Sequence, residues 1–515
     1  MNLWADIENI LSEGEATTNV ELLENLLMPM YLALPKNEHG HLGHATVRYA
    51  LHRFFAQRNT WFIKGLHNSS APQSLSPNGF LEERIPSYLQ ALFEQRLDEK
   101  GFGLHELSVV ASMVQRLVSN EVVKRLGDAY KVHGRLPTSK MKLKEMDEVL
   151  ETYMMAFILG ENLSNVTLQN ALDMKADMPD IFGSWNATRA FMRSLRRNIS
   201  AEDQVHDGYK FSFVAKVAER FGEQFGSFQN KECRQIKASL VALEEPGIGR
   251  VRLGDFWAPA LNGTWQFQES FDYLQLLGAL DQSDANNPRV MIANYIASPS
   301  NCVASSNFYS ICCVQECDVL LSQLEAQIAA PKAKPQRIAE LVMALTSTSV
   351  AAPRELSPSL LHRLDEIADE HDGSIWLHGR LFAQWMHHAF PRECPYPHLS
   401  GTTNPLTPDE WVKTIGKDES ATEEEMKAYA AKARLNDALD AGMVPLPWSS
   451  VEELLVHPAF KQQDAKGIFI ELPIRNSFLV TVLVTLTYGF IRAFRSSTVD
   501  SLDCPDVFRK SLVWV

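Results

Sequence analysis

The chain has 515 residues, of which 45% are hydrophobic and 22% are charged, and this composition excludes wholly disordered, collagen-like and low-complexity proteins. Asp and Glu outnumber Lys and Arg by 63 to 49, so the formal net charge is −14. A dedicated nucleic-acid-binding protein needs a basic surface that neutralises phosphates. We therefore expect no nucleic-acid partner.

Helical periodicity dominates the sequence, with apolar residues at three- and four-residue steps. The predicted helices span 20–34, which Pro29 should kink or break, 44–58, 84–98, 104–130, 142–160, 210–228, 230–244, 310–329, 335–347, 357–370, 376–390 and 422–440. Alternating strands are confined to 249–256 and 288–297. The predicted fold is mainly α, a multi-helical globular body with a few short strands.

Breaks rich in Pro, Ser and Gly suggest how the body is divided. We expect an N-terminal helical unit over 1–228, a Cys-containing helical unit with short strands over 229–347, and a His/Cys-containing helical unit over 348–460. No internal repeat points to a solenoid.

A C-terminal apolar segment predicts a membrane anchor. Residues 478–491 carry no charge, and we expect one transmembrane helix over 472–494, followed by a short tail over 495–515. A spanning helix needs about 20 mainly apolar residues. Arg475 and Arg492 flank the run and can extend towards the two membrane surfaces. The alternative is a buried strand pair or core helix, because Val and Thr favour strands.

The two signals for the compartment point in opposite directions. The N-terminal residues lack the basic region of a secretory signal, which predicts a tail anchor with residues 1–471 on the cytosolic face of an unidentified organelle. A reduced cytosolic face argues against disulfide bonds. N-x-S/T sequons would be glycosylated only on the other side, and they begin at Asn68, Asn162, Asn165, Asn186, Asn198 and Asn262.

The densest group of metal-ligating residue types lies between Trp376 and His398. Imidazole and thiolate groups bind zinc, copper and iron. The candidate ligands for a transition metal ion are His387, His388, Cys394 and His398. His378 would face away from His387 on one unbroken helix and could join only if that helix breaks. The alternative is that these histidines cap or pack structural elements.

A second cluster contains Cys302, Cys312, Cys313 and Cys317. On the predicted helix 310–329, Cys313 and Cys317 would be neighbours on one face, able to hold a metal or to sense an oxidant. The alternative is burial as free cysteines. A disulfide from Cys302 to Cys312 or Cys313 would need an oxidising compartment.

Two resemblances come from short motifs. LFAQWMHHAF, and LHRFF at 51–55 with His44 upstream, resemble the copper-binding helices of the tyrosinase family, which would imply copper. The two segments lie more than 300 residues apart, wider than in that family, and His378 lacks the expected i+4 histidine.

The block from about 228 to 411 resembles an uncharacterised family of proteins from algae and other unicellular eukaryotes. The residues that carry this resemblance are FQNKEC, GRVRLGDF, LLGALD, SNCVASSNFYSICC and HGRLFAQWMHHAFPRECPYPH. It implies a eukaryotic source, a shared architecture and a C-terminal apolar segment, and it implies no activity.

Two functions are consistent with these patterns. The first is an interaction or scaffold unit at a membrane surface, with unidentified protein partners. The second is a metal-dependent oxidoreductase that uses copper, iron or zinc in the 378–398 segment. The sequence contains no phosphate-binding glycine loop, H-E-x-x-H motif or nucleophile elbow that would name another activity.

Overall fold

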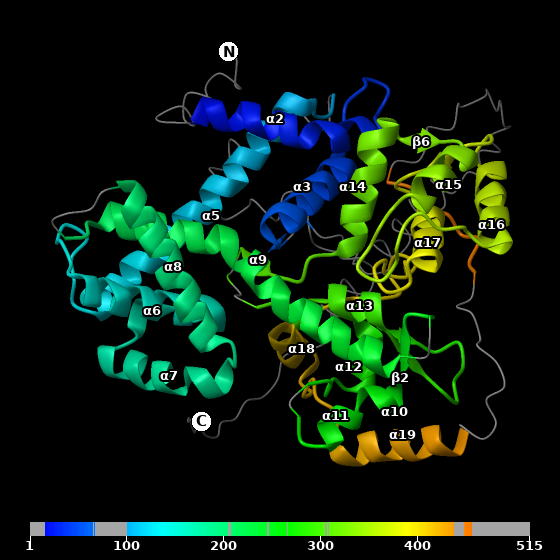
Figure 1. Ribbon diagram of the computed structural model, residues 1–515. Helices are drawn as coiled ribbons and strands as arrows, with labels where there is room; N and C mark the ends of the chain where they lie inside the picture. The colour runs from blue at the N-terminus through cyan, green and yellow to red at the C-terminus, as the bar shows by residue number, and fades with distance from the viewer. Residues whose placement is uncertain are drawn as a thin grey trace, which may run out of the picture. The chain divides into compact units, whose positions relative to one another are not determined.

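A computed structural model describes residues 16–455 except 65, 67–99, 204–207, 245–246, 265, 304–305, 307 and 437–447 (Figure 1). The expected helix 84–98 and the expected membrane anchor 472–494 lie outside the described residues. Within them the fold is mainly helical, as expected. None of the helices in this part of the chain combines the length and apolarity needed to cross a membrane.

The N-terminal half consists of long helices. These are α2 (Ala16–Ala33), α3 (His44–Asn59), α5 (Leu104–Val132), α6 (Leu143–Leu159), α7 (Leu168–Ile181), α8 (Trp185–Asp203) and α9 (Phe211–Leu243). The expectation of a break at Pro29 is wrong, because α2 continues through it. The expected gap after residue 228 is also absent, because buried Phe225, Gln229 and Cys233 continue one four-residue spacing along α9.

Helices α7 and α8 did not stand out in the sequence. Helix α8 buries Trp185, Met192, Leu195 and Ile199 in the hydrophobic core. Ion pairs also join it to α6: Arg189 and Arg193 both donate to Glu151, and Arg196 donates to Asp147. Only Ala171 and Met178 are buried along α7. The buried face is therefore short in α7, and in α8 it is set among several charged residues, so neither segment is markedly apolar in the sequence.

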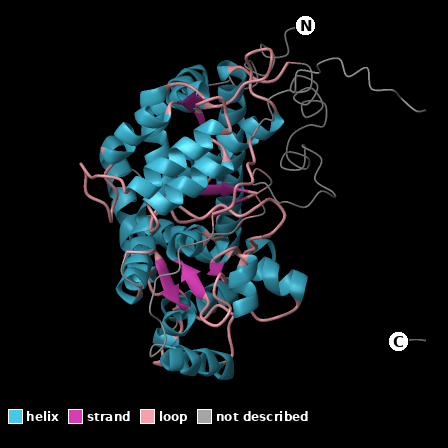
Figure 2. Cartoon of the chain, turned by 90° about the vertical axis from the view of Figure 1, so that its right-hand side faces the viewer, coloured by secondary structure: helices cyan, strands magenta, loops and turns pink. Residues whose placement is uncertain are grey.

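Short strands connect distant segments (Figure 2). β1 (Trp61–Ile63) pairs antiparallel with β5 (Tyr309–Ile311), and β6 (Lys332–Ala333) pairs with β7 (Ile375–Trp376). A three-stranded antiparallel sheet has the order β2 (Arg250–Arg252), β4 (Arg289–Met291), β3 (Leu280–Asp281). The expected strands 249–256 and 288–297 are shorter than predicted, because α10 (Leu253–Phe256) and α13 (Ile292–Ala297) follow β2 and β4 directly.

The remaining helices surround these strands. They are α11 (Ala258–Leu261), α12 (Phe271–Leu276), α14 (Glu316–Ile328), α15 (Pro335–Met343), α16 (Pro358–Asp369), α17 (Arg380–Ala389), α18 (Pro408–Ile415) and α19 (Glu423–Asn436), with single turns η1 (Leu163–Asn165) and η2 (Pro299–Asn301). Two predicted helices begin later than expected. Residues 309–311 form β5 before α14, and residues 375–376 form β7 before α17.

Three hydrophobic clusters fill the interior. The N-terminal helices and β5 share the first, which contains Trp185. Helices α14 to α17 share the second, which contains Trp385. The β2–β4 sheet with α18 and α19 shares the third, which contains Trp257. Each of these tryptophans is at most 2% exposed, so each cluster has a large aromatic side chain removed from water.

Three disulfide bonds among the described residues overturn the expectation of free thiols. The segment from Cys302 to Cys317 contributes to all three bonds: Cys302–Cys312, Cys233–Cys313 and Cys317–Cys394. Cys313 lies before α14 rather than on it, so it is not a helical neighbour of Cys317. The four clustered cysteines therefore offer no thiolate for a metal in this structure.

Candidate functional site

The structure does not bring the expected metal ligands together. Cys394 is bonded to Cys317, which removes its thiolate. The Nδ1–H of His387 donates to the carbonyl oxygen of Cys394 at 2.6 Å, and the Nε2–H of His398 donates to that of Gly278 at 2.7 Å. Among the described residues, no three His, Cys, Asp or Glu side chains form a group that could hold a metal ion.

The four histidines of the 378–398 segment are largely buried and are not arranged as metal ligands. Burial lowers the pKa of His387 to about 3, and burial also lowers the pKa values of His378, His388 and His398. His388 packs against Trp448, with ring centroids 5.8 Å apart. Each imidazole is therefore held neutral at neutral pH. The metal-site hypothesis for this segment has no support in the geometry.

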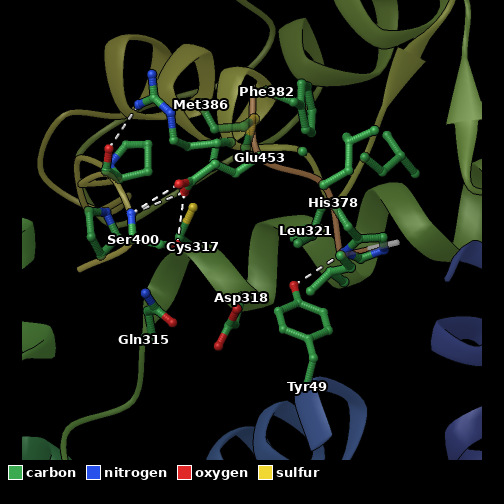
Figure 3. A pocket seen from close by; sticks show the side chains of 18 of the residues that line it. Tyr49, Gln315, Cys317, Asp318, Leu321, His378, Phe382, Met386, Ser400 and Glu453 are labelled. Atoms are coloured by element: carbon green, nitrogen blue, oxygen red, sulfur yellow. Dashed lines mark hydrogen bonds between the residues drawn. The ribbon is translucent and has the colours of Figure 1, made fainter. Parts of the chain in front are cut away.

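A cavity of about 520 Å³ lies where α3, α14, α17 and the segment 453–455 meet (Figure 3). Its apolar wall includes Leu321 of α14 and Phe382 and Met386 of α17. Its polar groups include Tyr49 of α3 and Asp318 of α14. The cavity thus combines an apolar surface with a few placed polar groups, which is typical of small-molecule sites.

A chain of polar contacts forms one end of the cavity. The Tyr49 hydroxyl lies 3.2 Å from Nδ1 of His378 (Figure 3). His378 Nε2 lies 3.2 Å from a carboxylate oxygen of Glu325. With neutral His378 in the Nε2–H tautomer, Nδ1 accepts the Tyr49 proton and Nε2 faces an acceptor. In that arrangement the Tyr49 oxygen keeps lone pairs that can accept a hydrogen bond from a ligand.

Arg53 stabilises the two acidic groups behind this end. Its guanidinium donates to Glu325 at 2.5 Å and to Asp318 at 3.1 Å, and the Arg53 and Glu325 side chains are at most 2% exposed. Burial raises the pKa of Asp318, and Arg53 offsets only part of this effect. At Glu325 the charge of Arg53 and the contact with His378 outweigh burial, so the pKa is lowered. Of the two acids, Glu325 is therefore the one that stays ionised at neutral pH.

Tyr49 is suited to hydrogen bonding rather than to nucleophilic attack. Burial is the largest influence and raises the pKa of its hydroxyl well above the usual range. An ionised phenolate is therefore strongly disfavoured at this position. The order of contacts from Tyr49 through His378 to Glu325 is that of a catalytic proton relay. Because the Tyr49 hydroxyl keeps its proton, the arrangement favours binding of a ligand by hydrogen bonds over nucleophilic catalysis.

The opposite end of the cavity is held by Arg380 and Glu453. The Arg380 guanidinium donates to the carbonyl oxygens of Pro397, Ser449 and Val451, so it is engaged by the backbone. The Glu453 carboxylate accepts hydrogen bonds from the Ser400 N–H and O–H (Figure 3).

The Cys317–Cys394 disulfide fixes the width of the cavity. Cys317 lies on α14 and lines the cavity, while Cys394 is directly followed by Pro395 on the wall beyond α17. Phe382 and Met386 of α17 are buried in the second hydrophobic cluster. A covalent bond and a packed core thus support both walls, which pre-organises the site.

A second cavity of about 270 Å³ surrounds a buried acid. The Tyr295 hydroxyl donates to Oε1 of Glu269 at 2.6 Å, and Oε2 has no hydrogen-bond partner among the described residues. Burial raises the pKa of Glu269 more than the Tyr295 hydrogen bond lowers it. This carboxyl group is therefore disposed to keep its proton, and it then offers a donor into the cavity.

Sequence reasoning named Cys317 and His378, which line the main cavity, but for other roles. It missed the ion pair behind that cavity and the buried acid Glu269 of the second cavity. Arg53 and Glu325 each stand beside apolar residues on amphipathic helices, Arg53 next to Phe54 and Glu325 next to Leu324. A charged residue within the apolar stripe of a helix is a signal of a buried ion pair. No such signal identifies the partner, because the two helices are far apart in sequence.

Comparison with protein-family models, with curated proteins and with solved structures gives no match to this chain.

Proposed function

We propose that this protein is a membrane-attached binding unit whose main cavity takes a small organic cation with an apolar body. The proposal rests on one observation: the cavity is largely apolar, and most of the polar groups at its surface are hydrogen-bond acceptors. Three carboxylates (Asp318, Glu325 and Glu453) line or adjoin it, against the two guanidinium groups of Arg53 and Arg380. Both guanidinium groups are already bound to protein acceptors.

The balance of charge favours a positive ligand. With His378 neutral and Asp318 ionised, acids exceed bases by one charge around the cavity, and a bound ammonium group would neutralise this excess. The ammonium N–H groups would find acceptors in Asp318 and the Tyr49 oxygen. Leu321, Phe382 and Met386 would cover the apolar part of the ligand.

Calorimetric titration of the oxidised full-length protein with hexylammonium, and with hexanol as the neutral match, tests this proposal. We expect the cation to bind about tenfold or more tightly than the alcohol, because one charge-assisted hydrogen bond is worth about 1.5–3 kcal/mol. Affinity should rise with pH, because Asp318 must release its proton to pair with the cation. Equal binding of the two probes would rule the proposal out.

Two variants locate the binding. Asp318→Asn should remove the preference for the cation, and Tyr49→Phe should weaken binding while the apolar wall stays intact. Asp272→Asn is the matched control, because Asp272 forms an exposed pair with Lys417 outside the cavity. An unchanged preference in Asp318→Asn would place the cation elsewhere.

Membrane attachment through 472–494 is part of the same proposal, and its support is the uncharged run 478–491. Deleting residues 477–515 should move the protein to the soluble fraction. If the truncated protein stays with the membrane, the segment is not the anchor. The proposal also includes an unidentified protein partner, which would bind the body of this protein at the membrane surface.

A further inference from the structure

We propose that the protein is N-glycosylated and that residues 16–455 fold on the oxidising side of a secretory-pathway membrane. The proposed modification sites are Asn162, Asn165, Asn186, Asn198 and Asn262. This inference is independent of the ligand proposed above, and it places the body on the side opposite to the one that the N-terminal sequence suggests.

The disulfide bonds are the first observation. All six cysteines among the described residues are paired, in three bonds. Two of the bonds join residues 80 and 77 positions apart, so the pairing results from the tertiary fold rather than from adjacency in the chain. Glutathione and thioredoxin keep such thiols reduced in the cytosol, whereas the lumen of the secretory pathway preserves the bonds.

The sequons are the second observation, and they do not depend on the cysteines. Each of the five described sequon asparagines is exposed at the surface. Asn162 precedes the short turn η1 and Asn165 ends it, while Asn262 follows α11. Asn186 and Asn198 lie on the solvent side of α8. A bulky glycan can therefore project into solvent at every one of them. Asn68, the sixth, lies outside the described residues.

The positions of the sequons leave the cavities open. Four of the five lie between the end of α6 and the end of α8, and none lines either cavity described above. Glycans at these four positions would thus cover the face formed by α6 and α8. On this face Arg189 of α8 pairs with Glu151 of α6, and Arg196 pairs with Asp147. The site around Tyr49 and Asp318 would stay accessible.

The chemistry requires a sugar donor that the protein itself does not supply, an oligosaccharide linked to a lipid pyrophosphate. The asparagine Nδ2 forms a bond to the anomeric carbon, and the bond from that carbon to the pyrophosphate oxygen breaks. One amide proton passes to a base of the transferase, and the lipid pyrophosphate leaves. Transfer to the unfolded chain precedes folding, so the buried hydroxyl of Thr188 in the Asn186 sequon is no obstacle.

Mass spectrometry of the native full-length protein, enriched from its source cells, gives the decisive test. Peptide N-glycosidase treatment in heavy-oxygen water converts each glycosylated asparagine to a labelled aspartate. We expect labelled aspartate at one or more of the five positions. Unmodified asparagine at all five would overturn the proposal.

Thiol trapping provides a second, independent readout on the same sample. Cells are lysed in denaturant with a maleimide, then the protein is reduced and labelled with a second, heavier maleimide. We expect the six paired cysteines to carry only the second label. The first label on all six would show a reducing environment and would also overturn the proposal.

A matched pair of variants tests one site directly. Thr264 is exposed, and its side chain completes the Asn262 sequon. In chains expressed behind a cleavable secretory leader, Thr264→Ala should lose one glycosidase-sensitive electrophoretic step. Thr264→Ser should keep it. Identical glycosylation of the two variants would exclude Asn262 as a site.

Discussion

Arg53 and Glu325 are 272 residues apart in the chain, and their side chains form an ion pair that is almost completely removed from water. The pair joins α3 to α14 at the back of the main cavity. Because the guanidinium also reaches Asp318, one arginine contacts two buried acids. The position of the polar end of the cavity therefore depends on a single basic side chain.

Arg53→Met should be strongly destabilising. Removal of one partner leaves buried charge uncompensated, which costs about 3–5 kcal/mol of the free energy of unfolding. Urea denaturation followed by circular dichroism measures this loss. Arg220→Met is the control, because the Arg220–Glu223 pair is exposed and should contribute almost nothing. Equal effects of the two changes would contradict a central role for Arg53.

His387 should make the protein less stable in acid. Its folded pKa of about 3 lies below the unfolded value of about 6.5, so its contribution is present above the unfolded pKa and is lost as pH falls towards the folded pKa. The expected loss from this residue between pH 7 and pH 5 is about 2 kcal/mol. Denaturation curves at both pH values, for the natural protein and His387→Gln, give the comparison. The variant should show the smaller drop.

Glu269 should act in the opposite direction. Its folded pKa is raised, so its contribution is fully present below the unfolded pKa of glutamate and decreases as pH rises towards the folded value. Glu269→Gln should therefore gain stability relative to the natural protein as pH rises from 4 to 8. Thermal unfolding across this range shows the trend. A constant difference between the two proteins would mean that folding does not shift the pKa of Glu269.

The disulfides should contribute unequally to stability. In the chain-entropy account, a bond that closes a longer loop stabilises more, and the sequence separations are 80 for Cys233–Cys313 and 10 for Cys302–Cys312. Replacing both cysteines of the first pair with Ser should cost about 4 kcal/mol, and replacing those of the second about 3 kcal/mol. Urea denaturation of the two double variants compares them directly. The reverse order would indicate that local packing dominates.

Apolar periodicity predicted the helices whose buried faces are continuous. The expected span 104–130 corresponds to α5, Leu104–Val132, and 357–370 corresponds to α16, Pro358–Asp369. It did not predict α8, although this helix buries Trp185, Met192, Leu195 and Ile199. The arginines between these residues, which pair with acids of α6, lower the hydropathy of the segment. A buried stripe that alternates with many charged residues is thus harder to recognise in a sequence than a continuous apolar one.

The candidate site was much harder to predict from the sequence than the helices were. His387, His388, Cys394 and His398 are close in sequence, but the carbonyl groups of Cys394 and Gly278 and the disulfide to Cys317 take up most of their bonding capacity. The cavity depends on Tyr49 and His378, which are 329 positions apart. Local spacing carries no information about contacts of that range.

The Cys317–Cys394 bond has a consequence for any protease that reaches the surface between its two ends. A cut in this interval would create two chains, yet the disulfide would hold them together. The nicked protein would therefore have nearly the mass of the intact protein and would separate into fragments only on reduction. Cleavage of the backbone and release of a fragment are thus separate events in this part of the molecule.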